Sequence, residues 1–315
     1  MKINAMLLKD FYKAVHVDML PKGMTKSVSY FTPRMTRIKQ WDKVVMFGLQ
    51  MFCKTWLIDY FNNHFFNCDK DEVINDYKKY MDWTLGLNVA NLKVIEDLYD
   101  LGYLPIEICA LPEGTLVPIH VPMFSITNTH KEFAWLPQAL ESLISAEMWY
   151  PMITATVGHT YRKIVNKYYA LSCDDDVIRS RALGNFDFRG DMCVDASLKA
   201  GAGWLLSFVN TATVPVIPFM EEMYNCSCTS MEEEVGFGAI STEHFVMCSN
   251  YAVDGDERTF LKKMLTDIYF NASFSAVCDS YDYWNVVNNI IPSLHEEIMN
   301  HNGCFLVRGD SGDCV

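Results

Sequence analysis

Residues able to bind phosphate and metal ions recur at the ends of short apolar runs in the second half of the sequence. These strand-end residues are Arg189, Asn210, His244, Asp279 and Asp310. Guanidinium groups bind phosphate oxygens in bidentate fashion, and carboxylates hold ribose hydroxyls or Mg²⁺. Any one of them alone would most simply be a capping or salt-bridge residue. Five in succession favour a site for a negatively charged, metal-chelating substrate.

The runs that would position these side chains alternate with helix-like segments. Their sequences are GNFDFRG, LLSFVNTAT, GFGAISTEH, FSAVCDSYD and CFLVRGDSG, beginning at residues 184, 205, 236, 274 and 304. Strands alternating with helices predict βα units of a parallel sheet, with the chemistry at the carboxyl ends of the strands. A closed barrel needs eight strands and about 250 residues. The five candidate strands therefore predict an α/β fold with an incomplete (βα) barrel, either an open half-barrel or the first part of a longer polypeptide.

The first half of the sequence has a different pattern. The first hundred residues are expected to be mainly helical, residues 104–127 take strand character around the turn at 112–114, and a helix is expected from 135 to 169. We therefore predict an N-terminal α+β domain over residues 1–155 and a partial barrel over 156–315.

Composition excludes several classes of function. The net charge of −13 argues against general nucleic-acid binding. The eleven cysteines include no CxxC pair, which favours reduced thiols over a zinc site. The most hydrophobic helix candidate, residues 44–61, contains Lys54 and Asp59, and residues 1–20 lack a signal-peptide core. We expect a cytoplasmic protein that does not enter the membrane.

Several segments, in order and spacing, resemble the nicotinamide phosphoribosyltransferase family. They are KDFYKAVH from residue 9, SYFTPR from 29, LPIEICALPEGTLVPIHVPMFSITNT from 104, the Trp-Tyr-Pro and Thr-Ala-Thr at 149–156, FDFRG from 186, the Glu-His pair at 243 and 244, SAVCDSYD from 275 and RGDSG from 308. The match covers essentially the whole chain. It implies the type II phosphoribosyltransferase fold and transfer of phosphoribosyl from phosphoribosyl pyrophosphate to nicotinamide.

The resemblance also implies residues that bind the pyridine base. Phe186 matches the aromatic residue stacking on one face of the ring, and Tyr12 matches the residue stacking on the other face from a partner subunit. Arg189 matches the arginine beside the carboxamide, and Ser275 matches a residue near the amide. Arg34 matches a residue that approaches the phosphates across the dimer interface. A homodimer with shared active sites is the implied assembly.

The catalytic residues implied by the resemblance lie toward the end of the chain. His244 matches the histidine that ATP phosphorylates in this family, and Asp279, Arg308 and Asp310 match residues lining the phosphoribosyl and magnesium site. Mg²⁺ is therefore the expected cofactor, with Asp279 and Asp310 as its ligands and ATP as an activating co-substrate.

Two departures from the family pattern weaken these expectations. Ala212 stands where the family has an Asp that accepts the nicotinamide NH₂, and Gly238 replaces a Ser near the amide. Asn210 and Asp187 are candidates to substitute for the missing carboxylate. The family also continues with a GDG segment and a glycine-rich phosphate loop, whereas this chain stops five residues after Asp310. We expect poor activity unless another chain supplies the missing barrel half.

Three functions remain open. The first is nicotinamide phosphoribosyltransferase activity in NAD salvage, and the second is the same transfer to nicotinate, because the position of Ala212 lacks a carboxylate. The third is a non-catalytic remnant that keeps the dimer surface and binds pyridine ligands. Assays with both bases separate the first two functions.

Overall fold

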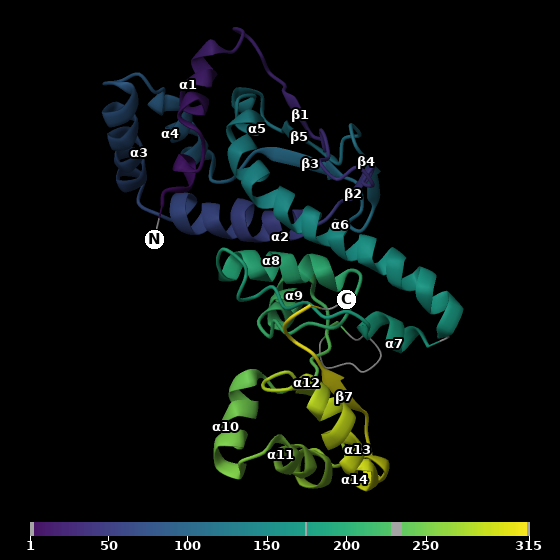
Figure 1. Ribbon diagram of the computed structural model, residues 1–315. Helices are drawn as coiled ribbons and strands as arrows, with labels where there is room; N and C mark the ends of the chain where they lie inside the picture. Colours follow the sequence, from purple (N-terminus) through teal and green to yellow (C-terminus); the bar gives the residue numbers. More distant parts are fainter. Residues whose placement is uncertain (1–2, 174, 228–234, 314–315) are drawn as a thin grey trace. The chain divides into compact units, whose positions relative to one another are not determined.

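The computed structural model describes residues 3–173, 175–227 and 235–313 (Figure 1). Its contacts divide the chain into two compact units, Met1–Phe237 and Gly238–Val315, each described here by itself. The domain boundary expected between residues 155 and 156 falls within the continuous helix α6 (Glu141–Ser172).

The first unit contains a three-stranded antiparallel sheet and a two-stranded one. The three-stranded sheet has the order β1 (Val28–Phe31), β5 (Phe124–Asn128), β3 (Ile106–Ala110), and the other pairs β2 (Lys43–Val45) with β4 (Leu116–Pro118). Burial alternates along β5, as expected for a strand with one face on the core. The strands expected over residues 104–127 are confirmed.

Helices surround these sheets, and local sequence explains where several of them begin and end. The Asp69 side chain accepts a hydrogen bond from the Glu72 amide to cap α3 (Lys70–Leu85), and Gly102 in the left-handed conformation ends α4 (Leu92–Leu101). The helix expected over 44–61 begins only at Leu49, because Val44 and Val45 belong to β2. The helices are η1 (Ala5–Leu7), α1 (Phe11–Met19), α2 (Leu49–Phe52), η2 (Cys53–Tyr60), η3 (Asn62–Phe66), α3 (Lys70–Leu85), α4 (Leu92–Leu101), η4 (Lys131–Phe133), α5 (Leu136–Ala139), α6, α7 (Asp176–Arg181), α8 (Val194–Leu205) and α9 (Val216–Tyr224).

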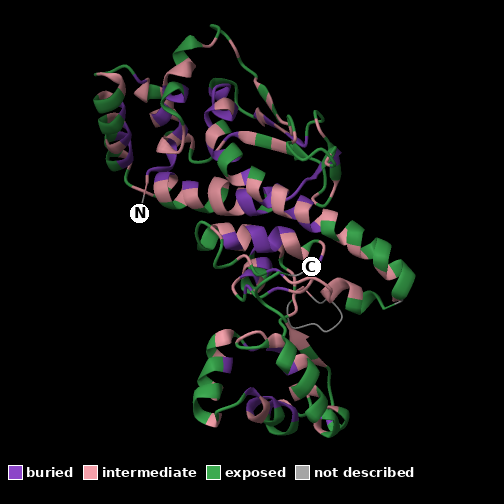
Figure 2. Cartoon of the chain, in the orientation of Figure 1, coloured by how far each residue is buried: buried purple, intermediate pink, exposed green. Residues whose placement is uncertain are grey.

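Small residues let α8 approach α6 closely. A Cβ atom on Gly203 would lie 2.8 Å from the Ala155 amide nitrogen and 2.9 Å from the Pro151 carbonyl oxygen. Buried residues of α2, α6, α8 and α9 form one apolar cluster in this region, and Figure 2 shows them in purple along α8. The contact holds α8, which follows the FDFRG segment in the chain, against α6.

The second unit packs helices around a short parallel sheet. Strands β6 (Phe274–Val277) and β7 (Phe305–Arg308) pair in parallel, with Phe274 opposite Phe305. Leu261, Leu265, Ala276 and Leu294 are fully buried in its core. The helices are α10 (His244–Asp254), α11 (Glu257–Lys263), η5 (Met264–Ile268), α12 (Tyr283–Asn285), η6 (Val286–Ile290), α13 (Ile291–Ser293) and α14 (His295–Asn300).

Within each unit, the predicted runs pair in parallel, as the alternation of strands and helices indicated. Single parallel bridges join Asn185 to Thr211 and Asn210 to Phe237 in the first unit, and Ser241 to Ser275 in the second. The first three runs are therefore shorter than expected, since only the last two form full strands. The α/β prediction is confirmed. Within the described residues, no helix combines the length and apolar character needed to cross a membrane.

Candidate active site

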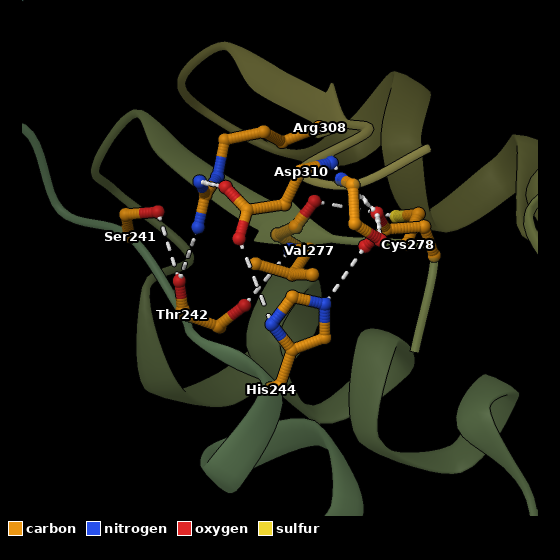
Figure 3. A network of polar contacts seen from close by, with 10 residues as sticks. Ser241, Thr242, His244, Val277, Cys278, Arg308 and Asp310 are labelled. Atoms are coloured by element: carbon orange, nitrogen blue, oxygen red, sulfur yellow. Dashed lines mark hydrogen bonds and ion pairs between the residues drawn. The ribbon is translucent and has the colours of Figure 1, made fainter. Parts of the chain in front are cut away.

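The second unit brings four of the predicted residues together at the carboxyl ends of β6 and β7. His244 begins α10, so its ring projects from the helix N-terminus (Figure 3). Its Nε2 atom lies 3.2 Å from Oδ1 of Asp279, and its Nδ1 atom lies 3.6 Å from Oδ2 of Asp310. The ring therefore lies between two carboxylates from neighbouring strand ends.

Asp279 is held in a fixed orientation by the turn after β7. Its Oδ2 atom accepts hydrogen bonds from the amides of Asp310 (2.8 Å) and Ser311 (2.6 Å) and from the Ser311 hydroxyl (2.8 Å). Burial alone would raise the pKa of Asp279, but these hydrogen bonds outweigh burial and lower the pKa. Asp279 is therefore ionised at neutral pH, and its Oδ1 atom faces the histidine.

Arg308 forms an ion pair and a hydrogen bond within the same site. Its Nη1 atom pairs with Oδ1 of Asp310, and its Nη2 atom donates to the Thr242 carbonyl oxygen at 3.1 Å. Its Nε atom is buried and has no hydrogen-bond partner among the described residues. Ser275 lies on β6, where its backbone bonds Ile240 and Thr242.

Phe186 and Arg189 share an exposed loop in the first unit. Phe186 is 61% exposed, which leaves a ring face available for stacking, and Arg189 is exposed as well. Asn185 fixes the start of this loop, because its side chain bonds both the Asp187 amide (2.8 Å) and the Asp187 carboxylate (3.0 Å).

The two positions that depart from the family pattern, Ala212 and Gly238, are both exposed to solvent. Ala212 is exposed, and its amide donates to the Asn185 carbonyl oxygen at 2.8 Å, which places it beside the Phe186 loop. A Cβ atom on Gly238 would meet nothing within 4 Å. Asn210 instead supports the backbone, since its side-chain amide donates to the Arg181 carbonyl oxygen at 3.1 Å.

Tyr12 and Arg34 lie elsewhere in the first unit. Tyr12 is 55% exposed, and its hydroxyl donates to Asp10 at 3.1 Å. Arg34 lines a cavity of about 410 Å³ together with Glu141 and residues of β1. Neither residue contacts Phe186 among the described interactions, and their expected reach into a partner subunit stays a prediction.

Sequence reasoning missed several residues of these arrangements. Ser311 lies in the RGDSG segment, yet its role in holding Asp279 depends on a contact across 32 positions. Tyr150, whose hydroxyl donates to Asp191 at 2.5 Å, also had no assigned role. The sequence feature that could have pointed to Tyr150 is the Trp-Tyr-Pro segment in which it lies.

Comparison with solved structures defines the class of fold. The human nicotinic acid phosphoribosyltransferase structure matches with a TM-score of 0.60 at 16% identity, covering 96% of this chain and 61% of that one. A nicotinate-nucleotide pyrophosphorylase from Pyrococcus furiosus matches with a TM-score of 0.50 at 13% identity, covering 98% and 67%. The fold is that of the type II phosphoribosyltransferases.

Sequence comparisons show which family within this class the chain is similar to. Residues 4–108 match the family model of the nicotinamide phosphoribosyltransferase N-terminal domain. The nicotinamide phosphoribosyltransferase of Acinetobacter baylyi is 35% identical over the whole chain, and that of Xanthomonas campestris is 29% identical over 99% of it. The chain is similar to nicotinamide phosphoribosyltransferases over its whole length, and these matches support that family. It spans 63% of the length of each of these two relatives.

Proposed function

We propose that this chain takes part in the transfer of phosphoribosyl from phosphoribosyl pyrophosphate to nicotinamide, giving nicotinamide mononucleotide and pyrophosphate in NAD salvage. The observation that supports this proposal best is the convergence of His244, Asp279, Arg308 and Asp310 at two adjacent strand ends. This grouping suits an anionic sugar phosphate.

The expected reaction separates charge at C1 of the ribose. As the bond from C1 to pyrophosphate breaks, the electron pair leaves with pyrophosphate, and positive charge develops on the sugar. Asp310 is suited to stabilise that positive charge, and Arg308 is suited to stabilise the departing pyrophosphate anion. The lone pair of the pyridine N1 then forms the new bond to C1, while Phe186 keeps the ring in place by stacking.

Mg²⁺ is the proposed cofactor, and Asp310 fits it better than Asp279 does. Oδ2 of Asp279 already accepts three hydrogen bonds, and Oδ1 faces His244. Asp310 has fewer partners, and a substrate phosphate that displaced it from Arg308 would free Oδ1. Mg²⁺ is commonly held by one or two carboxylates together with substrate phosphates, where it neutralises negative charge.

ATP is the proposed activating co-substrate, with His244 as the phosphorylated residue. When Nε2–H donates to Asp279, Nδ1 carries the lone pair and is the nitrogen able to attack the γ-phosphorus. An N–P bond would form as the bond from phosphorus to ADP breaks.

Transfer to nicotinate is the second candidate reaction. The exposed Ala212 beside the Phe186 loop favours it, because no carboxylate there repels the anionic base. A homodimer with Tyr12 and Arg34 reaching the partner's site, a cytoplasmic location, and a further chain that completes the barrel also belong to this proposal.

The proposal is tested by incubating the purified chain with phosphoribosyl pyrophosphate, Mg²⁺ and either base, and quantifying both mononucleotides by chromatography. A parallel reaction adds a polypeptide that covers the rest of the Acinetobacter baylyi relative. Nicotinamide mononucleotide formation that is lost in Asp310→Asn is the expected result. No product and no binding of either base in both reactions would contradict the proposal and favour a non-catalytic protein.

A further inference from the structure

A cavity of about 410 Å³ is lined by residues 3–14 and by α3, away from both groups of residues described above. Much of its wall is apolar, because Leu7, Phe11 and Met81 line it. Lys9 is the one basic residue among the described residues around it. Pockets that hold small ligands have volumes of this order and mainly apolar walls with a few polar groups. The cavity therefore suits a small ligand with an apolar body.

The amine of Lys9 lies beside aromatic rings and lacks an acceptor among the described residues. Its Nζ atom lies 5.1 Å from the centroid of the Tyr77 ring and 5.8 Å from that of Trp135. Burial lowers the pKa of Lys9 to about 7, and no hydrogen bond or ion pair opposes this fall. Close to half of the molecules therefore carry an uncharged amine at neutral pH.

The Lys9 amine is accessible to a ligand. The fully enclosed polar atoms that lack a partner among the described residues do not include its Nζ atom, so this atom keeps contact with solvent. The cavity is the opening that Lys9 lines. A small molecule in the cavity can therefore reach the amine.

The other charged groups along the cavity are acidic. Asp10 and Asp76 both line it. An anionic ligand would meet two carboxylates and a single amine that is only partly protonated, so the charges disfavour it. An uncharged ligand meets no such repulsion. Toward an uncharged ligand, the distinctive property of an unprotonated amine is its nucleophilic lone pair.

We propose that Lys9 is a carbonyl-reactive lysine and that the cavity beside it takes up an uncharged aromatic aldehyde, which forms an imine with the Lys9 amine. The nitrogen lone pair adds to the carbonyl carbon. As the C=N bond forms, the carbonyl oxygen takes up both amine protons through solvent and leaves as water. Desolvation in an apolar pocket is one of the ways in which proteins activate lysines for this reaction. Phe11, which is 52% exposed, offers a ring face to the aldehyde.

A purely structural role explains Lys9 less well. An amine that is buried without an acceptor lowers the free energy of unfolding wherever it is protonated, and no hydrogen bond offsets this cost. Lys13, the next lysine along the chain, shows the structural alternative, because its buried amine forms an ion pair with Glu141. An unpaired lysine beside a cavity fits a reactive role better than a structural one. The inference goes beyond the proposed function and does not depend on it.

Reductive trapping measures the reactivity of each lysine in the purified chain. The chain is incubated at neutral pH with benzaldehyde and cyanoborohydride, which reduces the imine to a stable secondary amine, and peptide mass spectrometry quantifies the label. Lys167 is the matched control, because its Nζ atom lies 5.3 Å from the centroid of the Tyr168 ring but the residue is exposed.

We expect Lys9 to be labelled at least about tenfold faster than Lys167. This ratio should fall as the pH rises toward about 10, because ordinary lysines lose their protons there, whereas Lys9 has already done so. Equal labelling of the two lysines at neutral pH would overturn the proposal, and so would a ratio that does not change with pH.

Further reactions test the cavity and the charge of its ligand. The ratio of Lys9 to Lys167 labelling should fall at least about threefold with para-carboxybenzaldehyde, which adds a carboxylate to the same ring. Thr84→Trp places a large side chain at an exposed position of the cavity wall and should slow the labelling of Lys9 alone. Unchanged labelling in this variant, with an unchanged melting curve, would show that Lys9 reacts outside the cavity and would contradict the proposal. Protection of Lys9 by benzoate but not by benzyl alcohol would identify an anion site instead.

Discussion

At the scale of single residues, the surroundings of a charged group decide what it can do. Asp279 is half-buried, and three hydrogen bonds keep it ionised with its Oδ1 atom facing His244. Lys9 lies at the other extreme, because its amine lies over two aromatic rings, with Nζ 5.1 Å from the Tyr77 centroid and 5.8 Å from the Trp135 centroid. Their surroundings therefore stabilise the charged form of Asp279 and destabilise the charged form of Lys9.

His244→Ala tests the proposed phosphohistidine at this scale. Loss of the ring should abolish ATP stimulation but leave basal transfer, because departure of pyrophosphate depends on Arg308 and Asp310 rather than on His244. The measurement is the ratio of ATP-stimulated to basal rate in the reaction that yields product, taken with a melting curve. The exposed His295→Ala variant is the control and should keep the ratio. Retained stimulation in His244→Ala would contradict the assignment.

Lys9→Met tests how burial acts on a charge. Burial lowers the pKa of Lys9 from 10.5 to about 7, so between these values the unfolded chain binds more protons than the folded one. The contribution of Lys9 to the free energy of unfolding must then rise as pH increases from about 7 toward 10. Lys9→Met should be more stable than wild type near pH 6 by about 3–5 kcal/mol, and this advantage should shrink as pH rises. Urea unfolding at several pH values measures it, and parallel stability curves for the two proteins would disprove the assigned pKa.

At the scale of elements, the contact between α6 and α8 positions the Phe186 loop, because that loop lies between these two helices in the chain. The contact requires the absence of a side chain at Gly203, where a Cβ atom would also meet the Thr154 hydroxyl. Helices approach this closely only through small residues, so steric fit fixes the position of the loop.

Gly203→Val should therefore force α8 away from α6. We expect a loss of about 2–4 kcal/mol in the free energy of unfolding and weaker binding of nicotinamide, because the Phe186 loop shifts with the helix. Gly238→Val is the matched control, since a Cβ atom there meets nothing within 4 Å. Denaturant unfolding of both variants tests the difference, and equal losses would contradict the packing argument.

At the scale of the whole molecule, each unit has its own apolar core. Buried side chains from α11, β6 and η6 form the core of the second unit, and the cores of the first unit draw on residues no later than Val235. Separate cores predict that each unit can open independently of the other.

Leu261→Ala tests that independence. Leu261 is fully buried in the second unit, so truncation should cost about 2–5 kcal/mol. Hydrogen exchange followed by mass spectrometry should show faster exchange in residues 238–313 and unchanged exchange in residues 3–173. Val253→Ala, at an exposed position of the same unit, is the control. Acceleration throughout the chain would show that the units unfold together.

The sequence by itself determined the order of the elements and the identity of the chemical groups. The alternation of apolar runs and helix-like segments predicted the runs that pair in parallel within each unit, because side-chain periodicity is a local property of the chain. The resemblance carried by segments such as RGDSG predicted the family, and the positions of His244, Asp279 and Asp310 after the strands predicted that they converge.

Only the tertiary structure decided the partner of each group. Asp279 meets His244 across 35 positions and Ser311 across 32, and Tyr150 meets Asp191 across 41. The sequence likewise left open that residues 44–45 form a strand, since pairing with β4 supplies their hydrogen bonds. A hydrogen bond depends on distances of a few tenths of an ångström between atoms far apart in the chain, and packing of the whole fold sets those distances.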